Sequence, residues 1–127
     1  MTKNPVVFWE LASHDADAST TFFNKVFDWT LEIDERLGFY VMPGAQGRGD
    51  PECMGIGGGV FTLKRAKLPF VTVYILVDDL DAKVKLIEKA GGFIVDPPQE
   101  IGTNRICLFN EPSGVTFAMI ERLAPKA

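Results

Sequence analysis

The side chains best suited to chemistry are few in this 127-residue chain. It has one histidine, His14, and two cysteines, Cys53 and Cys107. His14 lies in a polar Ser-His-Asp stretch, where a solvated turn residue is a commoner role than a metal ligand or a general base. The cysteines form no CxxC pattern, which favours free thiols in a reducing compartment and hence a cytoplasmic protein. Cys107 lies in an alternating apolar run and is expected to be a small buried hydrophobe.

Glu10 is the carboxylate with the most informative surroundings, because it lies within the apolar run of residues 5–11 (PVVFWEL). Alternation along a strand places Glu10 on the same face as Phe8. Apolar neighbours would remove water from this carboxylate and raise its pKa, so Glu10 is a candidate general base or partner of a cationic ligand. The alternative is a structural ion pair with Arg105 or another cation.

The stretch 69–92 (PFVTVYILVDDLDAKVKLIEKAGG) predicts a strand followed by a helix. Residues 70–77 are β-branched and aromatic, Asp78 or Asp79 can cap the helix, and Gly91-Gly92 can end it. Apolar residues recur at helical spacing. They predict the buried helix face: Leu80, Val84, Ile87 and Ala90.

The first half of the chain repeats this pattern at a shift of 64 residues, which places Phe8–Leu11 on Thr72–Ile75 and Asp15 on Asp79. The chain is therefore predicted to contain two copies of one supersecondary unit. Strand one, 5–11, is followed by a helix that begins near Asp15 and ends at about Phe27. The residues expected to face inward from this helix are Ala18, Phe22, Phe23, Val26 and Phe27.

The other predicted strands complete a β-α-β-β-β order in each half, with modules at about 5–63 and 69–122 of one domain spanning 1–127. These strands are 30–33, 39–42, 56–63, 93–95, 105–109 and 115–121. Pro97-Pro98 is expected to stop the strand at 93–95. Residues 43–55 are predicted to form the one long irregular loop, and 64–67 a basic connector. Three consecutive glycines, Gly57 to Gly59, indicate a bulge or a close approach by another group.

The composition excludes two classes of partner. Charged residues make up 24% of the chain and its net charge is −4, so no basic face for nucleic acid is expected. There is no long apolar run that could span a bilayer and no signal-peptide layout at the N-terminus. We therefore expect neither a nucleic-acid nor a membrane partner.

The order of these elements, with the motifs FWELASHDADASTTFFNKVFDW, VYILVDDLDAKVKLIEKAGG and NEPSGVTFAMIE, resembles the vicinal-oxygen-chelate superfamily of glyoxalases, bleomycin-resistance proteins and extradiol dioxygenases. The resemblance implies an α+β fold in which two tandem βαβββ modules form a curled mixed sheet cup with the helices outside. It also implies a small-molecule site in the cup, frequent homodimers and, in many members, a divalent metal. The metal is held by one residue from the first and fourth strands of each module.

The ligand positions that this resemblance implies carry unsuitable side chains. In the first strand of each module the ligand precedes the helix-capping Asp by seven residues, which gives Phe8 and Thr72. In the last strand it follows Glu111 by seven residues, which gives Ala118. The run 55–63 contains no His, Asp, Glu or Cys. Metals need imidazole, carboxylate or thiolate donors, so we expect no family-type metal and no cofactor.

A cup without these ligands is predicted to be a mostly apolar small-molecule site. Its expected lining residues are Phe8, Glu10, Thr72, Tyr74 and Ala118. One hypothesis is a metal-free binding protein of the bleomycin-resistance type that takes a small, partly apolar ligand. The alternative is a lyase, isomerase or dioxygenase-like enzyme with an atypical metal site or with Glu10 as general base.

Overall fold

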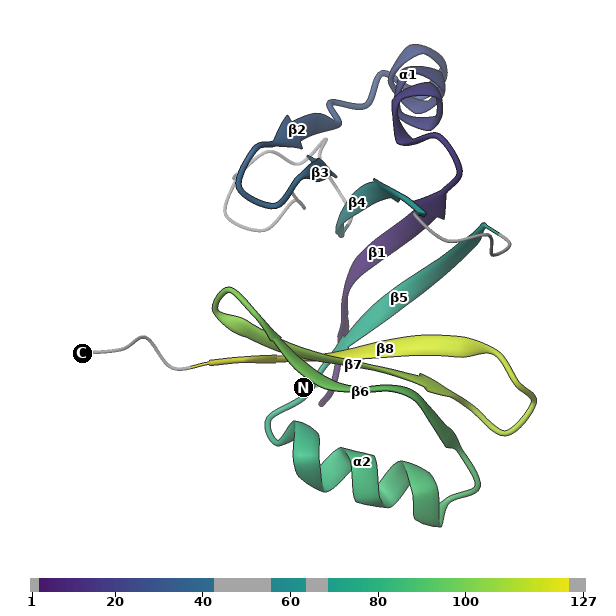
Figure 1. Cartoon of the computed structure of the whole chain (residues 1–127), viewed down its shortest axis with the longest axis vertical. Coiled ribbons are helices and arrows are strands. Elements are labelled where there is room, and N and C mark those ends of the chain that lie inside the picture. Colours follow the sequence, from purple (N-terminus) through teal and green to yellow (C-terminus); the bar gives the residue numbers. More distant parts are fainter. Residues whose placement is uncertain (1–2, 43–55, 64–68, 124–127) are drawn as a thin grey trace. The chain divides into compact units, whose positions relative to one another are not determined.

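The computed structural model describes residues 3–42, 56–63 and 69–123 (Figure 1). The predictions for 43–55, for 64–67 and for Cys53 lie outside these residues. Contacts divide the chain into two compact units. We call Phe8–Thr72 the first module, and Val73–Ala127 together with Met1–Val7 the second module.

The first module contains one helix and a four-stranded sheet in the order β2-β3-β4-β1. Strands β1 and β4 run parallel, and the other neighbouring pairs run antiparallel. The elements are β1 Val6–Ser13, α1 Ala16–Phe27, β2 Glu32–Asp34, β3 Phe39–Met42 and β4 Gly57–Thr62.

The strands of the second half follow the same plan, in the order β5-β8-β7-β6, with β5 and β8 parallel. Its elements are β5 Phe70–Leu76, α2 Leu80–Lys89, β6 Phe93–Ile101, β7 Asn104–Asn110 and β8 Thr116–Arg122. The predicted α+β fold of two tandem βαβββ modules with mixed strand directions is confirmed.

The two helices begin in the same way. Asp15 caps α1 by accepting a hydrogen bond from the amide of Ala18, and Asp79 caps α2 by accepting from Ala82, both at 3.1 Å. These side chains satisfy amides that have no partner within the helix. Helix α2 ends at Lys89, and Gly91 takes a left-handed φ of 95°. The capping residues predicted from the 64-residue repeat are therefore confirmed.

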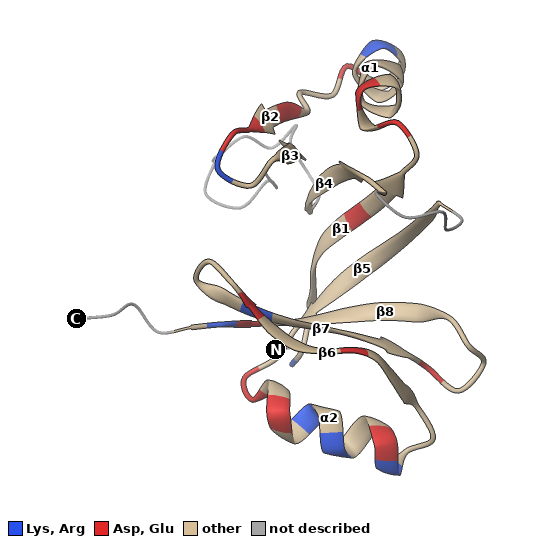
Figure 2. Ribbon diagram, in the orientation of Figure 1, with Lys and Arg blue, Asp and Glu red and all other residues tan. Residues whose placement is uncertain are grey.

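The buried face of α2 is largely as predicted. Leu80, Val84 and Ile87 all belong to the apolar core of the second module. Ala90 is exposed, against the prediction, because it is the residue at which the helix ends. Figure 2 shows acidic and basic residues interspersed along α2, as expected for a helix with one solvated face.

The predicted buried face of α1 is wrong in most positions. Ala18 is exposed, and Phe22, Val26 and Phe27 are each more than half exposed. The buried positions are Ala16 and Thr20, with Phe23 packed against the same core. The prediction took one aromatic-rich face as buried, but α1 packs on β3 and β4 through a face that carries smaller side chains together with Phe23.

Strand β6 also departs from the prediction, because it continues through Pro97-Pro98 to Ile101. The strand lies at the edge of the β5-β8-β7-β6 group, and its pairing with β7 shifts register between Asp96 and Gln99. Prolines lack an amide proton, but an edge strand with an irregular register needs none at those positions.

One buried hydroxyl on α1 provides a test of the packing. Thr20 is 4% exposed and its Oγ1 has no hydrogen-bond partner. We expect Thr20→Val to raise the free energy of unfolding by about 1 kcal/mol, since an unpaired buried hydroxyl is costly. Thr62 is the matched control, because its Oγ1 accepts from the amide of Ala16 at 3.0 Å. Urea unfolding should show that Thr62→Val lowers stability, and a loss in both variants would contradict the assignment.

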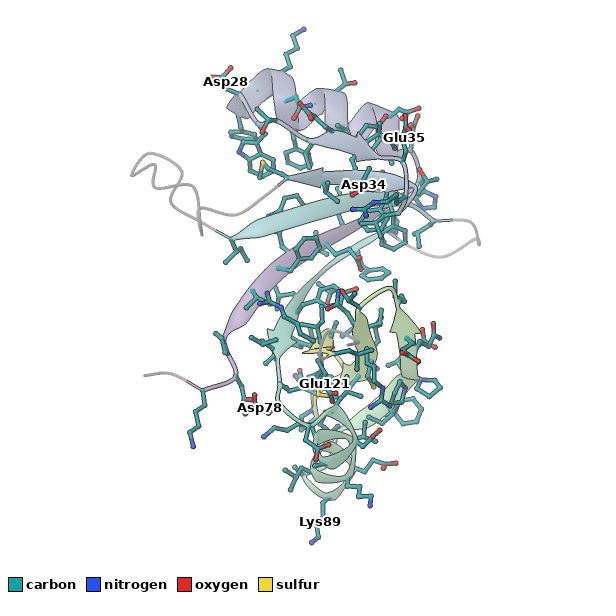
Figure 3. All side chains as sticks on the ribbon, turned by 90° about the vertical axis from the view of Figure 1, so that its left-hand side faces the viewer. Asp28, Asp34, Glu35, Asp78, Lys89 and Glu121 are labelled. Carbon is teal, nitrogen blue, oxygen red and sulfur yellow. The ribbon has the colours of Figure 1, made fainter. Side chains whose placement is uncertain are left out.

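A charged cluster holds the beginning of α2 on its sheet. Arg105 donates two hydrogen bonds of 3.0 Å to the carboxylate of Asp81, and Glu121 Oε1 accepts from the amide of Leu80 at 2.8 Å. Figure 3 shows Glu121 beside one end of α2 and Lys89 at the other. The hydrogen bond from Arg105 lowers the pKa of Asp81 below its ordinary value of 3.8.

This cluster predicts a small acid-dependent loss of stability. Because the folded pKa of Asp81 is depressed, its contribution is present above pH 3.8 and is lost as the pH falls through the lower folded pKa. Asp81→Asn should therefore lower the urea midpoint at neutral pH and converge with the wild type in acid. The effect is small because the pair is exposed to solvent. Glu88→Gln on the same helix is the control, and an equal loss in that variant would show a general charge effect.

Within the residues that the structure describes, neither helix is both long and apolar enough to cross a membrane.

Candidate functional site

The sheet of the first module has one face covered by α1 and one face turned away from it, which we call the open face. Trp9 and Leu11 of β1 pack against the core beneath α1. Phe8 and Glu10 alternate with them and therefore lie on the open face, as predicted. Both are partly buried within β1.

Strands β3 and β4 follow the same alternation. Tyr40 and Val60 pack beneath α1, which leaves Phe39 and Val41 of β3 and Gly59 and Phe61 of β4 on the open face. Thr62 supports this assignment of faces, because its hydroxyl accepts a hydrogen bond from the amide of Ala16 at the start of α1. The open face is therefore mostly apolar. Its residues include Phe8, Glu10, Phe39, Val41, Gly59 and Phe61.

The glycines of β4 let aromatic rings lie on the sheet from both sides. A methyl group at Gly58 would lie only 1.8 Å from Trp9 Cε2, on the α1 side. A methyl group at Gly59 would lie 3.2 Å from Phe8 Cζ and 3.2 Å from Phe39 Cε2, on the open face. The close approach suggested by the glycine run is confirmed, and the approaching groups are side chains of this same module.

In the second module, Tyr74 of β5 lies opposite Ala118 of β8. Their neighbours Ile75 and Met119 pack in the core with Leu80, so Tyr74 and Ala118 lie on the face turned away from α2. Tyr74 is 6% exposed and Ala118 is fully buried. Thr72, two residues before Tyr74 on β5 and the last residue of the first module, is 3% exposed.

The register settles the ligand position that the glycine run had obscured. Glu10 lies opposite Gly59, and the equivalent Tyr74 lies opposite Ala118, so Gly59 corresponds to Ala118. The four positions at which the resemblance implies metal ligands are Phe8, Gly59, Thr72 and Ala118. Together they offer one hydroxyl, on the buried Thr72, and a carbon side chain or none elsewhere.

This donor set does not fit a divalent metal, which needs several imidazole, carboxylate or thiolate groups converging on one point. Among the described residues, no group of three His, Cys, Asp or Glu side chains is placed to hold a metal ion. His14 is exposed just before α1. The side chains at the four implied positions therefore lack the donor groups that coordination of a divalent metal needs.

The other two residues considered for chemistry have defined environments. Arg105, the suggested ion-pair partner of Glu10, forms its bidentate pair with Asp81 on α2. Cys107 is a free, fully buried thiol in the core of the second module, as predicted, and burial raises its pKa. A buried thiol with a raised pKa is a poor nucleophile, so Cys107 is a packing residue.

Two open-face residues were missed from the sequence, Phe39 and Phe61. A strand of only four residues gave no clear parity for Phe39. The glycine run next to Phe61 gave no apolar alternation from which its face could be inferred. The signal that was present was Gly59 itself, since a strand glycine often marks a place where another group lies on the backbone.

A model of the Glyoxalase/Bleomycin resistance protein/Dioxygenase superfamily matches residues 6–119. The chain belongs to this superfamily, as the sequence motifs had indicated.

Two curated relatives are proteins of anthracycline biosynthesis. They are DnrV of Streptomyces peucetius and DauV of Streptomyces sp. strain C5, each 29% identical over 126 residues. The match covers 88% of this chain but 45% of each relative. The chain therefore spans less than half the length of the curated relatives that it matches.

Solved structures with this fold include methylmalonyl-CoA epimerases. The enzyme of Streptomyces coelicolor, in complex with 2-nitronate-propionyl-CoA, has a TM-score of 0.65 at 15% identity and covers 97% of this chain and 100% of its own. The enzyme of Mycobacterium tuberculosis has a TM-score of 0.63 at 16% identity, with 98% and 93% covered. At this level of identity the likeness shows the fold alone.

Proposed function

We propose that this protein binds a small, partly apolar molecule through the sheet faces turned away from its helices, without a family-type metal. The observation that carries the proposal is the set of side chains at the four implied ligand positions, Phe8, Gly59, Thr72 and Ala118. Each module, taken by itself, brings apolar and polar side chains to the face turned away from its helix, with Phe8 and Glu10 in the first module and Tyr74 and Ala118 in the second. Apolar contact with a few polar groups is the usual composition of a small-molecule site.

The relatives in anthracycline biosynthesis support a ligand with a flat, largely apolar ring system. Glu10 would provide the one charged contact on the β1 part of the site, suited to an amino group of such a ligand. The alternative function, an enzyme with Glu10 as general base or with an atypical metal arrangement, uses the same carboxylate in a different role.

A binding experiment with matched ligands tests the proposal. Glu10→Gln should weaken binding of a fluorescent anthracycline that carries an amino sugar, and should leave binding of its sugar-free aglycone unchanged, because only the charged contact is lost. Fluorescence titration gives both affinities. Equal weakening of both ligands would contradict the contact with the amine and favour a structural role for Glu10.

Elemental analysis of the purified protein is the companion measurement. We expect substoichiometric Zn, Ni, Fe and Mn, because the implied ligand positions lack donors. One equivalent of any of these metals per chain would overturn the metal-free proposal and favour the enzyme with an atypical site.

The proposal of a homodimer rests on the resemblance to the family, and light scattering at micromolar concentration tests it. The proposal of a cytoplasmic location rests on the cysteine usage.

A further inference from the structure

Three strands of the first module bring phenylalanines to the open face around one bare position. Strand β4 lies between β3 and β1, and Gly59 lies opposite Val41 on one side and Glu10 on the other. Phe39 of β3 and Phe8 of β1 both reach over this glycine, each with a ring carbon 3.2 Å from where a Cβ would be. A Cβ at position 59 would thus be tightly surrounded, by the two rings and by the backbone oxygen of Tyr40 at 3.0 Å.

The two rings are suited to contact with a ligand. Phe8 and Phe39 are only partly buried as residues. Phe61, two residues after Gly59 on the same strand, adds a third partly buried ring to the face. Aromatic rings prefer offset-stacked or edge-to-face contact with other rings, which adds to the effect of burying apolar area.

We infer that Phe8 and Phe39, lying over Gly59, form an aromatic floor on which a flat ring of the ligand stacks. The inference rests on the proposed small-molecule function and specifies its ligand class, a molecule with a planar aromatic ring system. A side chain at Gly59 would crowd both rings and the backbone oxygen of Tyr40, so a glycine at this position lets the rings lie close to the sheet. Glu10, beside the floor on β1 and opposite Gly59, then selects among such molecules those that carry a positive charge near the ring system.

A structural role alone is the competing explanation, since aromatic side chains can compensate for a glycine within a sheet. The two explanations differ in what a ring deletion does. A structural role predicts a loss of stability without a change in the affinity of the folded protein. An aromatic floor predicts a loss of affinity for flat aromatic ligands in particular.

The probes are a fluorescent anthracycline aglycone, which is flat and aromatic, and a saturated fatty acid, which is apolar without a ring. The variants are Phe39→Leu, which keeps apolar volume, and Phe39→Tyr, which keeps the ring. Phe22→Leu on α1 is the matched control, because Phe22 is 55% exposed on the module's other side. Each variant is first shown to be folded by thermal unfolding and circular dichroism.

We expect Phe39→Leu to weaken aglycone binding about two- to tenfold, from the usual strength of an aromatic pair, while Phe39→Tyr and Phe22→Leu retain it. Gly59→Ala should weaken it at least as much. If Phe39→Leu and Phe8→Leu both bind the aglycone as tightly as the wild type does, the aromatic floor is overturned. It is also overturned if the wild-type protein binds the fatty acid but not the aglycone. Wild-type protein that binds neither probe nor any member of a small-molecule panel would overturn the proposed function itself.

Discussion

Replacing Gly58 with alanine is expected to destabilise the first module by about 3 kcal/mol, the upper end of the usual cost of overfilling a core. The added Cβ would lie 1.8 Å from Trp9 Cε2 and 2.2 Å from Trp9 Cδ2, which is far inside van der Waals contact. The indole cannot simply move aside, because Trp9 packs against the core of this module and its ring lies 5.5 Å from that of Trp29.

Chemical unfolding followed by tryptophan fluorescence measures this effect. The double variant Gly58→Ala/Trp9→Leu provides the sharper test, since a shorter side chain at position 9 makes room for the new methyl group. The two substitutions should then be strongly non-additive, as expected for residues in direct contact. A Gly58→Ala protein within 0.5 kcal/mol of the wild type would show that β4 does not need a glycine here.

The packing of Trp9 matters for the site as well as for stability. Trp9 and Phe8 are adjacent on β1, so burying the indole beneath α1 commits Phe8 and Glu10 to the open face. Gly58 and Gly59 are likewise adjacent on β4 and face opposite sides of the sheet. Gly58 lies under Trp9, and Gly59 lies under Phe8 and Phe39. A one-residue slip of either strand would exchange the core side chains and the site side chains.

Replacing Leu80 with alanine is expected to have the second large effect. It should lower the free energy of unfolding of the second module by about 2–5 kcal/mol. Leu80 is the first residue of α2 and is fully buried. It lies in a core with Val77, Cys107 and Met119, and the cavity left by its removal would open between α2 and the strands β7 and β8. Its amide is also held by Glu121, so the surrounding backbone has little freedom to close that cavity.

Leu86→Ala is the matched control, because Leu86 is a leucine on the same helix that is 55% exposed. Its effect should be within about 0.5 kcal/mol of the wild type, which is typical of surface positions. Urea unfolding of the two variants compares a buried leucine with an exposed one, since the same side-chain atoms are removed from both. Similar losses in both would show that burial of the Leu80 side chain is not the cause of the destabilisation.

Much of the fold could be predicted from local patterns. The capping residues Asp15 and Asp79 and the glycines after α2 depend on interactions within a few residues, and they are confirmed. The 64-residue repeat is a match between two such local patterns, and the element order confirms it. The same count along the chain identified Phe8, Thr72 and Ala118 as the residues at three implied ligand positions. Residue type alone then argued against a family-type metal site.

Other features depended on which surfaces meet. Helix α1 had apolar residues on more than one face, and only packing against β3 and β4 determined that Phe22 and Val26 stay exposed. Pro97-Pro98 is compatible with a strand because β6 lies at an edge of its sheet, which no local pattern reveals.

The candidate site shows the same division between local pattern and packing. The sequence by itself determined that Phe8 and Glu10 share a strand face and that no metal donor lies in the glycine run. Only the tertiary structure decided which glycine corresponds to Ala118, because register is a property of strand pairing between β1 and β4. The same pairing brought Phe39 over Gly59 from a strand that is distant in sequence. The sequence gives the type of each side chain, but the residues that surround a glycine such as Gly59 are determined only when the strands pair.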